Sequence, residues 1–183
     1  MPRADACSRM NLQTARLELV PATAELIRLE ISDPHALGHR LNAGIPAGWP
    51  PEEVKGVLEF FAGQMDTGVT GDGWGIYYWV TQAGGDRPHT LVGSGGFMSK
   101  PNVNGAVEIG YGTLDEFQGR GYATESVSGL VRWALSQPDV STVIAEALPE
   151  SASVRVLLKN GFADVGPGME EGTRRFAVSR EKQ

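Results

Sequence analysis

The stretch from Ala106 to Gln137 reads AVEIGYGTLDEFQGRGYATESVSGLVRWALSQ and decides the fold of the chain. In its first eight residues, Val107, Ile109 and Tyr111 occupy every second position. A period of two residues is typical of a β-strand, because successive side chains of a strand point to opposite faces of the sheet. The stretch therefore begins with a predicted strand.

The second half of this stretch has the spacing of an amphipathic helix, with apolar residues three and four positions apart. Between strand and helix lies the turn Gln118–Ala123, which is rich in small residues. Such a turn directs several backbone N–H groups at one place, and the helix dipole adds roughly half a positive charge there. We therefore predict an anion site that suits a phosphate. The apolar helix positions are Val127, Leu130, Val131, Ala134 and Leu135.

The spacing of the turn distinguishes between kinds of phosphate loop. A Walker loop requires a Gly-Lys pair, which the chain lacks. A Rossmann fingerprint requires a small residue at the position of Thr124, and no βαβ unit begins the chain. The pattern Gln118-x-x-Gly121-x-Ala123 instead resembles the acetyl-CoA pyrophosphate loop of the GNAT N-acetyltransferases, especially their ribosomal-protein (RimJ/RimL-like) branch. The alternative is a glycine-rich connection without a ligand.

Two further segments carry the resemblance. The opening L-x-T-x-R-L-x-L of residues 12–19 is similar to the start of RimJ/RimL-like domains. A helix predicted from Ser151, where the serine is expected to cap it, contains Ala152–Arg155 and then Lys159-x-Gly161-Phe162. These residues reproduce most of the family's downstream pattern, with Ser151 in place of its usual asparagine. A hydroxyl reaches less far than a carboxamide toward CoA.

The resemblance implies an α/β (α+β) fold. Its sheet is mixed but mostly antiparallel, with six or seven strands, and about four helices flank it. A central pair of strands splays into a V. Gly110 and Gly112, on the same strand face as Glu108, weaken a strand unless something must approach its backbone, which is consistent with such an opening. The alternative is an ordinary twisted strand.

The resemblance also implies acetyl-CoA as cosubstrate, without a metal. The pantetheine arm of acetyl-CoA is then expected to dock in the splayed pair as an extra strand, and the diphosphate at the turn. The expected cofactor-binding residues are Ile109, Gly110, Tyr111, Gln118, Gly119, Arg120, Gly121, Tyr122, Ala123, Thr124, Ser151 and Lys159.

Transfer of an acetyl group from a thioester to an amine requires a neutral amine, a polarised carbonyl and a stabilised thiolate. Glu108 is the candidate base, directly or through a water, because it interrupts a strand that otherwise reads as buried, and burial raises a carboxyl pKa. The alternative is a solvent-facing or ion-paired glutamate.

Ser153 is the candidate beside the leaving thiol, and the alternative is an ordinary serine in the first turn of a helix. A strand N–H near Ile109 is expected to stabilise the oxyanion.

The irregular stretch from Gly44 to Pro51 covers the acceptor pocket in the resembled family. Leu41, Ile45 and Trp49 are therefore candidates for the acceptor site, and the alternative for Trp49 is a packing anchor of the loop. The sequence leaves the acceptor open among a protein N-terminus, a small amine and an antibiotic. His35 and His39 share a spacing of four residues, but no third ligand for a metal is evident.

The remaining segments predict further regular elements by their periodicity. A first strand is expected over 12–19, with Leu17 and Leu19 inward, and a helix over 26–31 capped by Thr23. A short helix is expected over 35–41, and a longer one from Pro51 to Gln64. Further strands are expected over 74–80, 91–97 and 141–147, and a closing hairpin over 163–165 and 174–179. Gly93-x-Gly95-Gly96 indicates close strand packing, since no helix follows it.

Composition and length indicate the domain organisation and the cellular compartment to expect. With 183 residues and 41% hydrophobic residues, we expect one globular domain over 10–179, a flexible extension over 1–9 and a frayed tail over 180–183. Met10 is a possible natural start. The lone Cys7 excludes an internal disulfide, and no long apolar run or signal-peptide core is present, so a cytoplasmic protein without membrane contact is expected.

The net charge of −6 argues against nucleic-acid binding and favours amine or basic-peptide substrates. The leading hypothesis is an acetyl-CoA-dependent N-acetyltransferase that acts by direct attack in a ternary complex, as a monomer or a homodimer. The alternatives are a CoA-binding module without turnover, and a structural or partner-binding domain.

Overall fold

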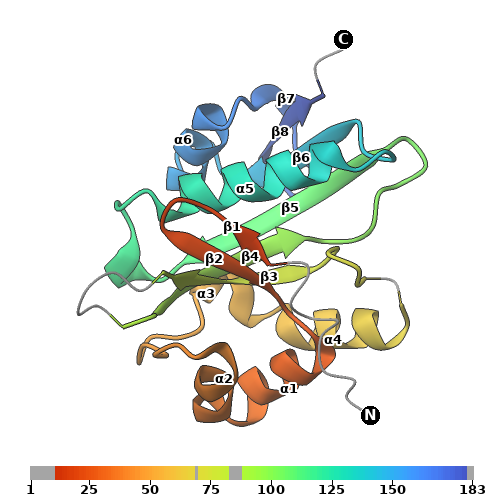
Figure 1. Ribbon diagram of the computed structural model, residues 1–183. Helices are drawn as coiled ribbons and strands as arrows, with labels where there is room; N and C mark the ends of the chain where they lie inside the picture. The colour runs from red at the N-terminus through yellow and green to blue at the C-terminus, as the bar shows by residue number, and fades with distance from the viewer. Residues whose placement is uncertain (1–10, 69, 83–87, 181–183) are drawn as a thin grey trace.

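The computed structural model describes residues 11–68, 70–82 and 88–180, which form one mixed sheet with helices on both faces (Figure 1). The strands are β1 (Leu12–Gln13), β2 (Leu17–Pro21), β3 (Ile76–Thr81), β4 (Leu91–Phe97), β5 (Ala106–Thr113), β6 (Thr142–Ala147), β7 (Ala163–Pro167) and β8 (Arg174–Ser179). Their order in the sheet is β1-β2-β3-β4-β5-β6-β8-β7. Every neighbouring pair is antiparallel except β5 and β6. The mixed, mostly antiparallel sheet is confirmed, with eight strands in place of six or seven.

Some predictions concern parts of the chain outside the described residues. These are the extension over 1–9 with Cys7, the possible start at Met10, and the tail beyond Arg180.

The extra strand arises at the start of the chain, where the prediction of a single strand over 12–19 was wrong. The chain instead forms the hairpin β1–β2, in which Leu12 lies opposite Leu19. It reverses because the hydroxyl of Thr14 and the backbone of Leu17 bond to each other, with both contacts at 3.0 Å. Leu17 and Leu19 are fully buried, as predicted. In a period of two residues, Leu12 is out of phase with Leu17 and Leu19, and this change of phase marks the reversal that the prediction of one strand missed.

The helices divide between the two faces of the sheet (Figure 1). They are α1 (Ala24–Ser32), α2 (Pro34–Leu41), α3 (Glu52–Lys55), α4 (Leu58–Asp66), α5 (Tyr122–Ser136) and α6 (Ala152–Lys159), with a short 3-10 helix, η2 (Asp115–Phe117). The helix predicted from Pro51 to Gln64 was wrong as one element: it is interrupted at Gly56, whose residue type has a weak helix propensity. The predicted Thr23 cap is confirmed, since it accepts the N–H of Leu26 at 3.2 Å.

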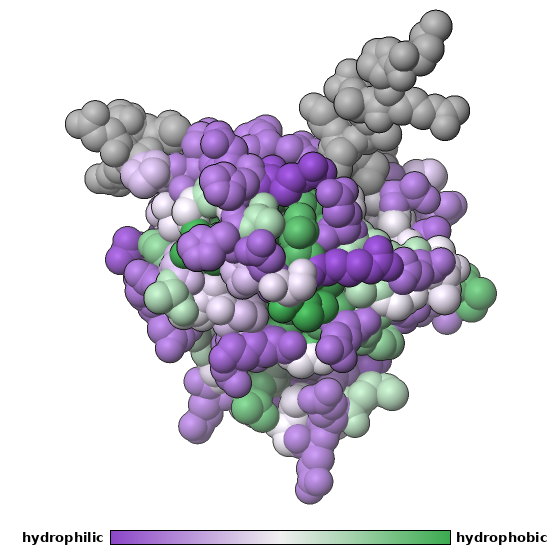
Figure 2. All heavy atoms as spheres, turned by 90° about the horizontal axis from the view of Figure 1, so that it is seen from below, coloured by the Kyte–Doolittle hydropathy of each residue, from purple (hydrophilic) through white to green (hydrophobic). Residues whose placement is uncertain are grey.

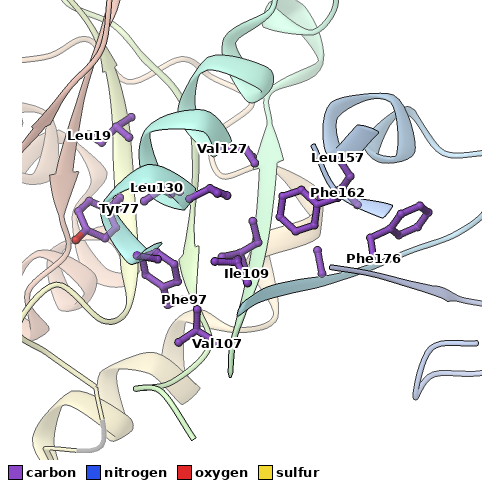
Figure 3. Close-up of a cluster of buried hydrophobic side chains, with 14 of the residues drawn as sticks. Leu19, Tyr77, Phe97, Val107, Ile109, Val127, Leu130, Leu157, Phe162 and Phe176 are labelled. Carbon is purple, nitrogen blue, oxygen red and sulfur yellow. The ribbon is translucent and has the colours of Figure 1, made fainter. Parts of the chain in front are cut away.

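The alternation along β3 separates two hydrophobic cores. Tyr77 and Trp79 face α5 and α6, whereas Tyr78 and Val80 face α1, α2 and α4. Figure 3 shows the first core, in which α5 and α6 lie over β3 to β6. The side chains labelled there are Leu19, Tyr77, Phe97, Val107, Ile109, Val127, Leu130, Leu157, Phe162 and Phe176.

The glycines of β4 allow close packing between strands, as predicted. A Cβ at Gly93 would lie 2.6 Å from the carbonyl oxygen of Gly112. Cβ atoms at Gly95 and Gly96 would overlap β5 and Gly75, respectively. These glycines therefore bring β3, β4 and β5 together rather than bind a phosphate.

Figure 2 shows the face that α1, α2 and α4 present to solvent, where hydrophobic residues emerge in a small group among hydrophilic ones. Ile31 of α1 and Phe60 of α4 are about half exposed, at 49% and 53%. Within the described ranges, no helix combines the length and the apolar composition needed to cross a membrane.

Candidate active site

The centre of the sheet opens between β5 and β6. These parallel strands pair only from Ala106 to Glu108, opposite Thr142 to Ile144. Beyond this point β5 continues to Thr113 and β6 to Ala147 without a shared register. The predicted splayed pair is therefore confirmed.

The backbone of β5 beyond Glu108 has polar groups available to the opening. Hydrogen-bonded pairs alternate along an antiparallel ladder, and the bond from the Met98 N–H to the Glu108 carbonyl, at 2.9 Å, fixes the alternation between β4 and β5. Gly110 and Gly112 thus direct their N–H and C=O groups at β4. Tyr111 lies between these two glycines in the strand, so its backbone N–H and C=O groups point toward the opening. An extended ligand could form hydrogen bonds with them there.

The turn at the start of α5 has the geometry that the predicted anion site requires. Gly119 and Gly121 have φ angles of 72° and 81°, a left-handed conformation that glycine adopts without steric cost. Among the described residues, none accepts a hydrogen bond from the N–H groups of residues 119–124. These donors lie at the N-terminus of a fifteen-residue helix, where the dipole favours negative charge.

The turn, the open end of β5 and the start of α6 enclose a pocket of about 390 Å³. The predicted residues that line it are Tyr111, Gln118, Gly119, Gly121, Tyr122, Ala123, Thr124, Ser151, Ser153 and Lys159. Ile109, Gly110 and Arg120 lie outside this lining. The structure adds lining residues that were not among the expected cofactor-binding or catalytic residues: Glu53, Gly112, Thr113, Phe117, Ala152, Arg155 and Val156.

Two hydroxyl groups in the pocket residues have unused hydrogen-bonding capacity. The hydroxyl oxygens of Thr113 and Ser151 are buried, and neither has a partner among the described residues. The expected side-chain cap by Ser151 was wrong: Ser151 stands at the N-cap of α6, but its side chain makes no capping bond. Its carbonyl accepts the N–H of Val154 instead, at 3.2 Å. Buried polar groups are normally paired, so these hydroxyls fit a ligand that carries amide and phosphate groups.

Residues of the first hairpin and of α5 hold the turn through contacts that the apolar pattern did not predict. One Glu125 carboxylate oxygen accepts the hydroxyl of Thr14 at 2.6 Å and the N–H of Arg16 at 2.7 Å. Its other oxygen accepts Nε of Arg16, also at 2.7 Å. The same guanidinium donates to the carbonyl of Arg120 at 2.9 Å and lies 4.7 Å from the Tyr122 ring centre. We call these residues the Glu125 cluster.

We expect the Glu125→Gln variant to bind acetyl-CoA roughly three- to tenfold more weakly, because it loses about 1 kcal/mol of charge-assisted bonding that orders the turn. Titration calorimetry measures the change. The matched control is Glu116→Gln, an exposed residue beside the turn that bonds nothing among the described residues. Equal affinities for the two variants would contradict a role of the Glu125 cluster in cofactor binding.

The Glu125 cluster also has a defined pH dependence. Partial burial favours protonation, but bonds from Thr14 and Arg16 outweigh it and lower the pKa of Glu125. A lowered carboxyl pKa contributes stability above the unfolded value of about 4.3 and loses it as the pH falls through the folded value. The stability difference between parent and Glu125→Gln should therefore shrink on acidification.

Helix α6 is fixed against the opening by two side chains. The hydroxyl of Tyr111 donates to the carbonyl of Ser153 at 3.3 Å. Burial raises the pKa of Tyr111 to about 12, so the phenol is neutral at physiological pH. At the other end of α6, the Asn160 amide donates to the carbonyl of Thr124 at 3.2 Å. The pocket wall from α6 is thus tied to both β5 and α5.

Glu108 lies on the sheet face away from α5, in line with the strand alternation. Burial raises the pKa of Glu108, and the negative charge of Glu146 raises it further. The positive charge of Arg175 lowers this pKa, and Glu170 again raises it, but burial is the largest of these effects. Glu146 itself is engaged, because it accepts Arg175 at 2.8 Å and the N–H of Met169 at 2.9 Å. The pKa of Glu108 is thus raised, whereas the pKa of Glu146 is lowered.

Comparison with known proteins identifies this arrangement. The family model described as the acetyltransferase (GNAT) domain matches residues 9–163, which is most of the chain. The chain belongs to the GNAT acetyltransferase family. It is an acetyl-CoA-dependent N-acyltransferase, and the expected cosubstrate is confirmed at the level of the family.

Individual relatives agree with the GNAT assignment. The uncharacterized N-acetyltransferase YjdG of Bacillus subtilis is 28% identical over 159 residues, which are 85% of this chain and 86% of that protein. The solved structure of RimL, a ribosomal L7/L12 α-N-protein acetyltransferase, has a TM-score of 0.59 at 18% identity and covers 98% of this chain and 99% of its own. The microcin C7 self-immunity acetyltransferase MccE, solved with acetyl-CoA and AMP, has a TM-score of 0.61 at 13% identity, with coverage of 96% and 100%. At these identities the two structures support the fold.

The three acceptor candidates of this GNAT domain do not line the pocket beside the turn. Ile45 and Trp49 line a separate cavity of about 720 Å³ beside α2, and Leu41 packs on the core beneath α1 and α4. Trp49 is also anchored, since its indole N–H donates to the buried carboxylate of Glu30 at 2.8 Å. Tyr78 donates to the other oxygen of Glu30 at 2.7 Å. Trp49 therefore serves as a packing anchor of its loop, whatever else it does.

His35 and His39 both line the larger cavity from α2. In the part of the chain that the structure describes, no three His, Cys, Asp or Glu side chains are arranged to hold a metal ion.

Proposed function

We propose that the chain transfers the acetyl group of acetyl-CoA to a primary amine by direct attack in a ternary complex. One observation carries the proposal. The N–H groups of residues 119–124, which have no acceptor among the described residues, adjoin a pocket that also contains the splayed end of β5 and two buried hydroxyls without a partner in the same ranges. The turn for an anion, the strand edge for an extended ligand and the two polar hydroxyls thus lie together. A cofactor with a diphosphate and an amide-containing arm requires this arrangement.

In this proposal each part of the pocket binds one part of acetyl-CoA. The diphosphate accepts the N–H groups of the turn, and the arm pairs with the free backbone edge at Tyr111. Ile109 and Gly110 contribute from the strand, Gly110 by leaving space, since a Cβ there would meet only Met98. Arg120, Arg155 and Lys159 supply positive charge at the mouth. Gln118 keeps the turn closed, because its amide donates to Asp115 at 2.9 Å and to Thr113 at 3.2 Å.

Acetyl-CoA supplies the activated acetyl thioester, and the protein positions the reactants and moves protons. Glu108 is the proposed base, directly or through a water, because its pKa is raised toward the range in which a carboxylate accepts a proton effectively. Ser153 is proposed beside the leaving thiol. Tyr111 adds a neutral phenol at that place, since it already touches the Ser153 carbonyl.

The acceptor is proposed to be a primary amine that is cationic in solution, in keeping with the net charge of −6. A protein N-terminus, a small amine and an antibiotic remain the candidate classes. The RimL-like fold favours the first by analogy alone. Ile45 and Trp49 stay proposed as acceptor contacts through the cavity beside α2.

A thiol-release assay tests the proposal. The parent protein is incubated with acetyl-CoA and, in turn, a free-N-terminal peptide, a diamine and an aminoglycoside. We expect CoA release that depends on one of these amines. Binding of acetyl-CoA without release from any of them would favour the CoA-binding module, and no binding in calorimetry would favour a structural or partner-binding domain.

A further inference from the structure

The cofactor pocket contains a carboxylate that the acetyl-transfer scheme above does not use. Glu53 of α3 lines this pocket, and Glu108 does not. One carboxylate oxygen of Glu53 lies 2.9 Å from the place that a Cβ on Gly112 would take. Since 3.0 Å is about the closest approach that real Cβ atoms make, any side chain at position 112 would displace this carboxylate. The glycine of β5 therefore makes room for a charge above the open end of the strand.

This carboxylate is not part of an ion pair within the part of the chain that the structure describes. Among the described residues, none donates a hydrogen bond to the Glu53 side chain or pairs with its charge. The nearest cation along the helix, Lys55, bonds to Glu52 at 2.6 Å instead. A negative charge at the edge of a pocket, held without a protein partner, is available to a cationic ligand.

The backbone of α3 at Glu53 is held against β5 by its neighbours, and the Glu53 side chain itself is exposed. Val54 is buried at 5% exposure, and Pro51, also buried, has its Cβ 3.0 Å from the Cβ position of Gly112. Helix α3 is thus seated on β5 by the residues on either side of Glu53. Gly112 and Glu108 lie on the same face of β5, four residues and so about 13 Å apart along the strand. The two carboxylates therefore lie at opposite ends of the splayed segment.

We propose that Glu53 binds the ammonium group of the acceptor and holds the amine at the opening between β5 and β6. This inference rests on the proposed acetyl transfer. Amines arrive protonated at neutral pH, and a carboxylate accepts two or more of their N–H bonds. Glu53 receives the charged amine on the pocket side. Because Glu108 lies about 13 Å farther along the strand, the proton reaches it through intervening water and not by direct contact. The site thus selects cationic alkyl amines over neutral nucleophiles.

The test compares Glu53→Gln with Glu52→Gln, a neighbouring exposed glutamate on the same short helix that lies outside the pocket lining. We measure kcat and KM for an alkyl diamine and for an uncharged arylamine, with acetyl-CoA affinity by calorimetry. We expect Glu53→Gln to lower kcat/KM for the diamine roughly ten- to hundredfold, mainly through KM, because a charged hydrogen bond is lost. Acetyl-CoA affinity, the thermal midpoint and the arylamine reaction should not change.

The outcomes separate this inference from the proposed function. If the parent transfers acetyl groups and Glu53→Gln behaves as Glu52→Gln does, the role of Glu53 is wrong and the transferase proposal stands. A loss of acetyl-CoA affinity, or an equal loss with both amines, also overturns it, because Glu53 would then act on the cofactor or the fold. If the parent transfers to no amine, the proposed function fails and this inference with it.

Discussion

The Gly121→Glu variant should lose acetyl-CoA binding by at least about a hundredfold. Gly121 has a φ of 81°, so any side chain is strained there, and a Cβ would lie 3.3 Å from the Arg16 guanidinium. The new carboxylate would stand where the turn offers its N–H groups to a diphosphate. Loss of one or two charged hydrogen bonds costs about 3 kcal/mol or more, which is a hundredfold in Kd. Titration calorimetry with acetyl-CoA measures this.

The matched control is Gly172→Glu. Gly172 has the same φ of 81°, and a Cβ there meets nothing within 4 Å, so this variant carries the same backbone strain away from the pocket. It should retain the parent affinity. If Gly121→Glu binds acetyl-CoA as tightly as the control does, the turn is not the diphosphate site.

The second large effect is expected from Glu108→Gln. A carboxamide cannot accept a proton, and general base catalysis contributes about a hundredfold or more, so kcat should fall by that order while acetyl-CoA affinity is kept. A base must be deprotonated, and burial beside Glu146 raises the pKa of Glu108. The acidic limb of the parent's kcat/KM profile should therefore lie above the ordinary glutamate value of about 4.3, and the variant should lack it.

Stability separates a catalytic loss from unfolding. A raised carboxyl pKa means that the folded state binds the proton more tightly, so the contribution of Glu108 to stability decreases as the pH rises from its unfolded to its folded pKa. At neutral pH the Gln variant should be at least as stable as the parent. An unchanged rate and pH profile in Glu108→Gln would remove this residue from the mechanism.

Much of the fold and of the candidate site was predictable because its signals are local. The strand, turn and helix over 106–137 follow from a change of apolar period within one segment. Gly110 and Gly112 predicted an opening in the sheet, and the pairing of β5 with β6, which stops at Glu108, confirms it. The turn glycines indicated an anion site because both their left-handed conformations and the first helical N–H groups are dictated by neighbours in sequence.

The remainder depends on contacts between distant segments, which periodicity does not encode. Arg16 and Glu125 are 109 positions apart and meet only because β2 lies beside α5 in the fold. Glu53 reaches the pocket because α3 sits on β5, and the interruption at Gly56 that shapes α3 broke no apolar pattern. Thr113 ends a strand like many others, and what distinguishes it is a buried hydroxyl that has no partner among the described residues.

A crystal structure of the protein grown with coenzyme A tests the central claim most directly. The diphosphate should accept hydrogen bonds from the N–H groups between Gly119 and Thr124, with the pantetheine arm lying along β5 in the opening beside Tyr111. A diphosphate bound at any other part of the surface, with this turn left free, would contradict the account.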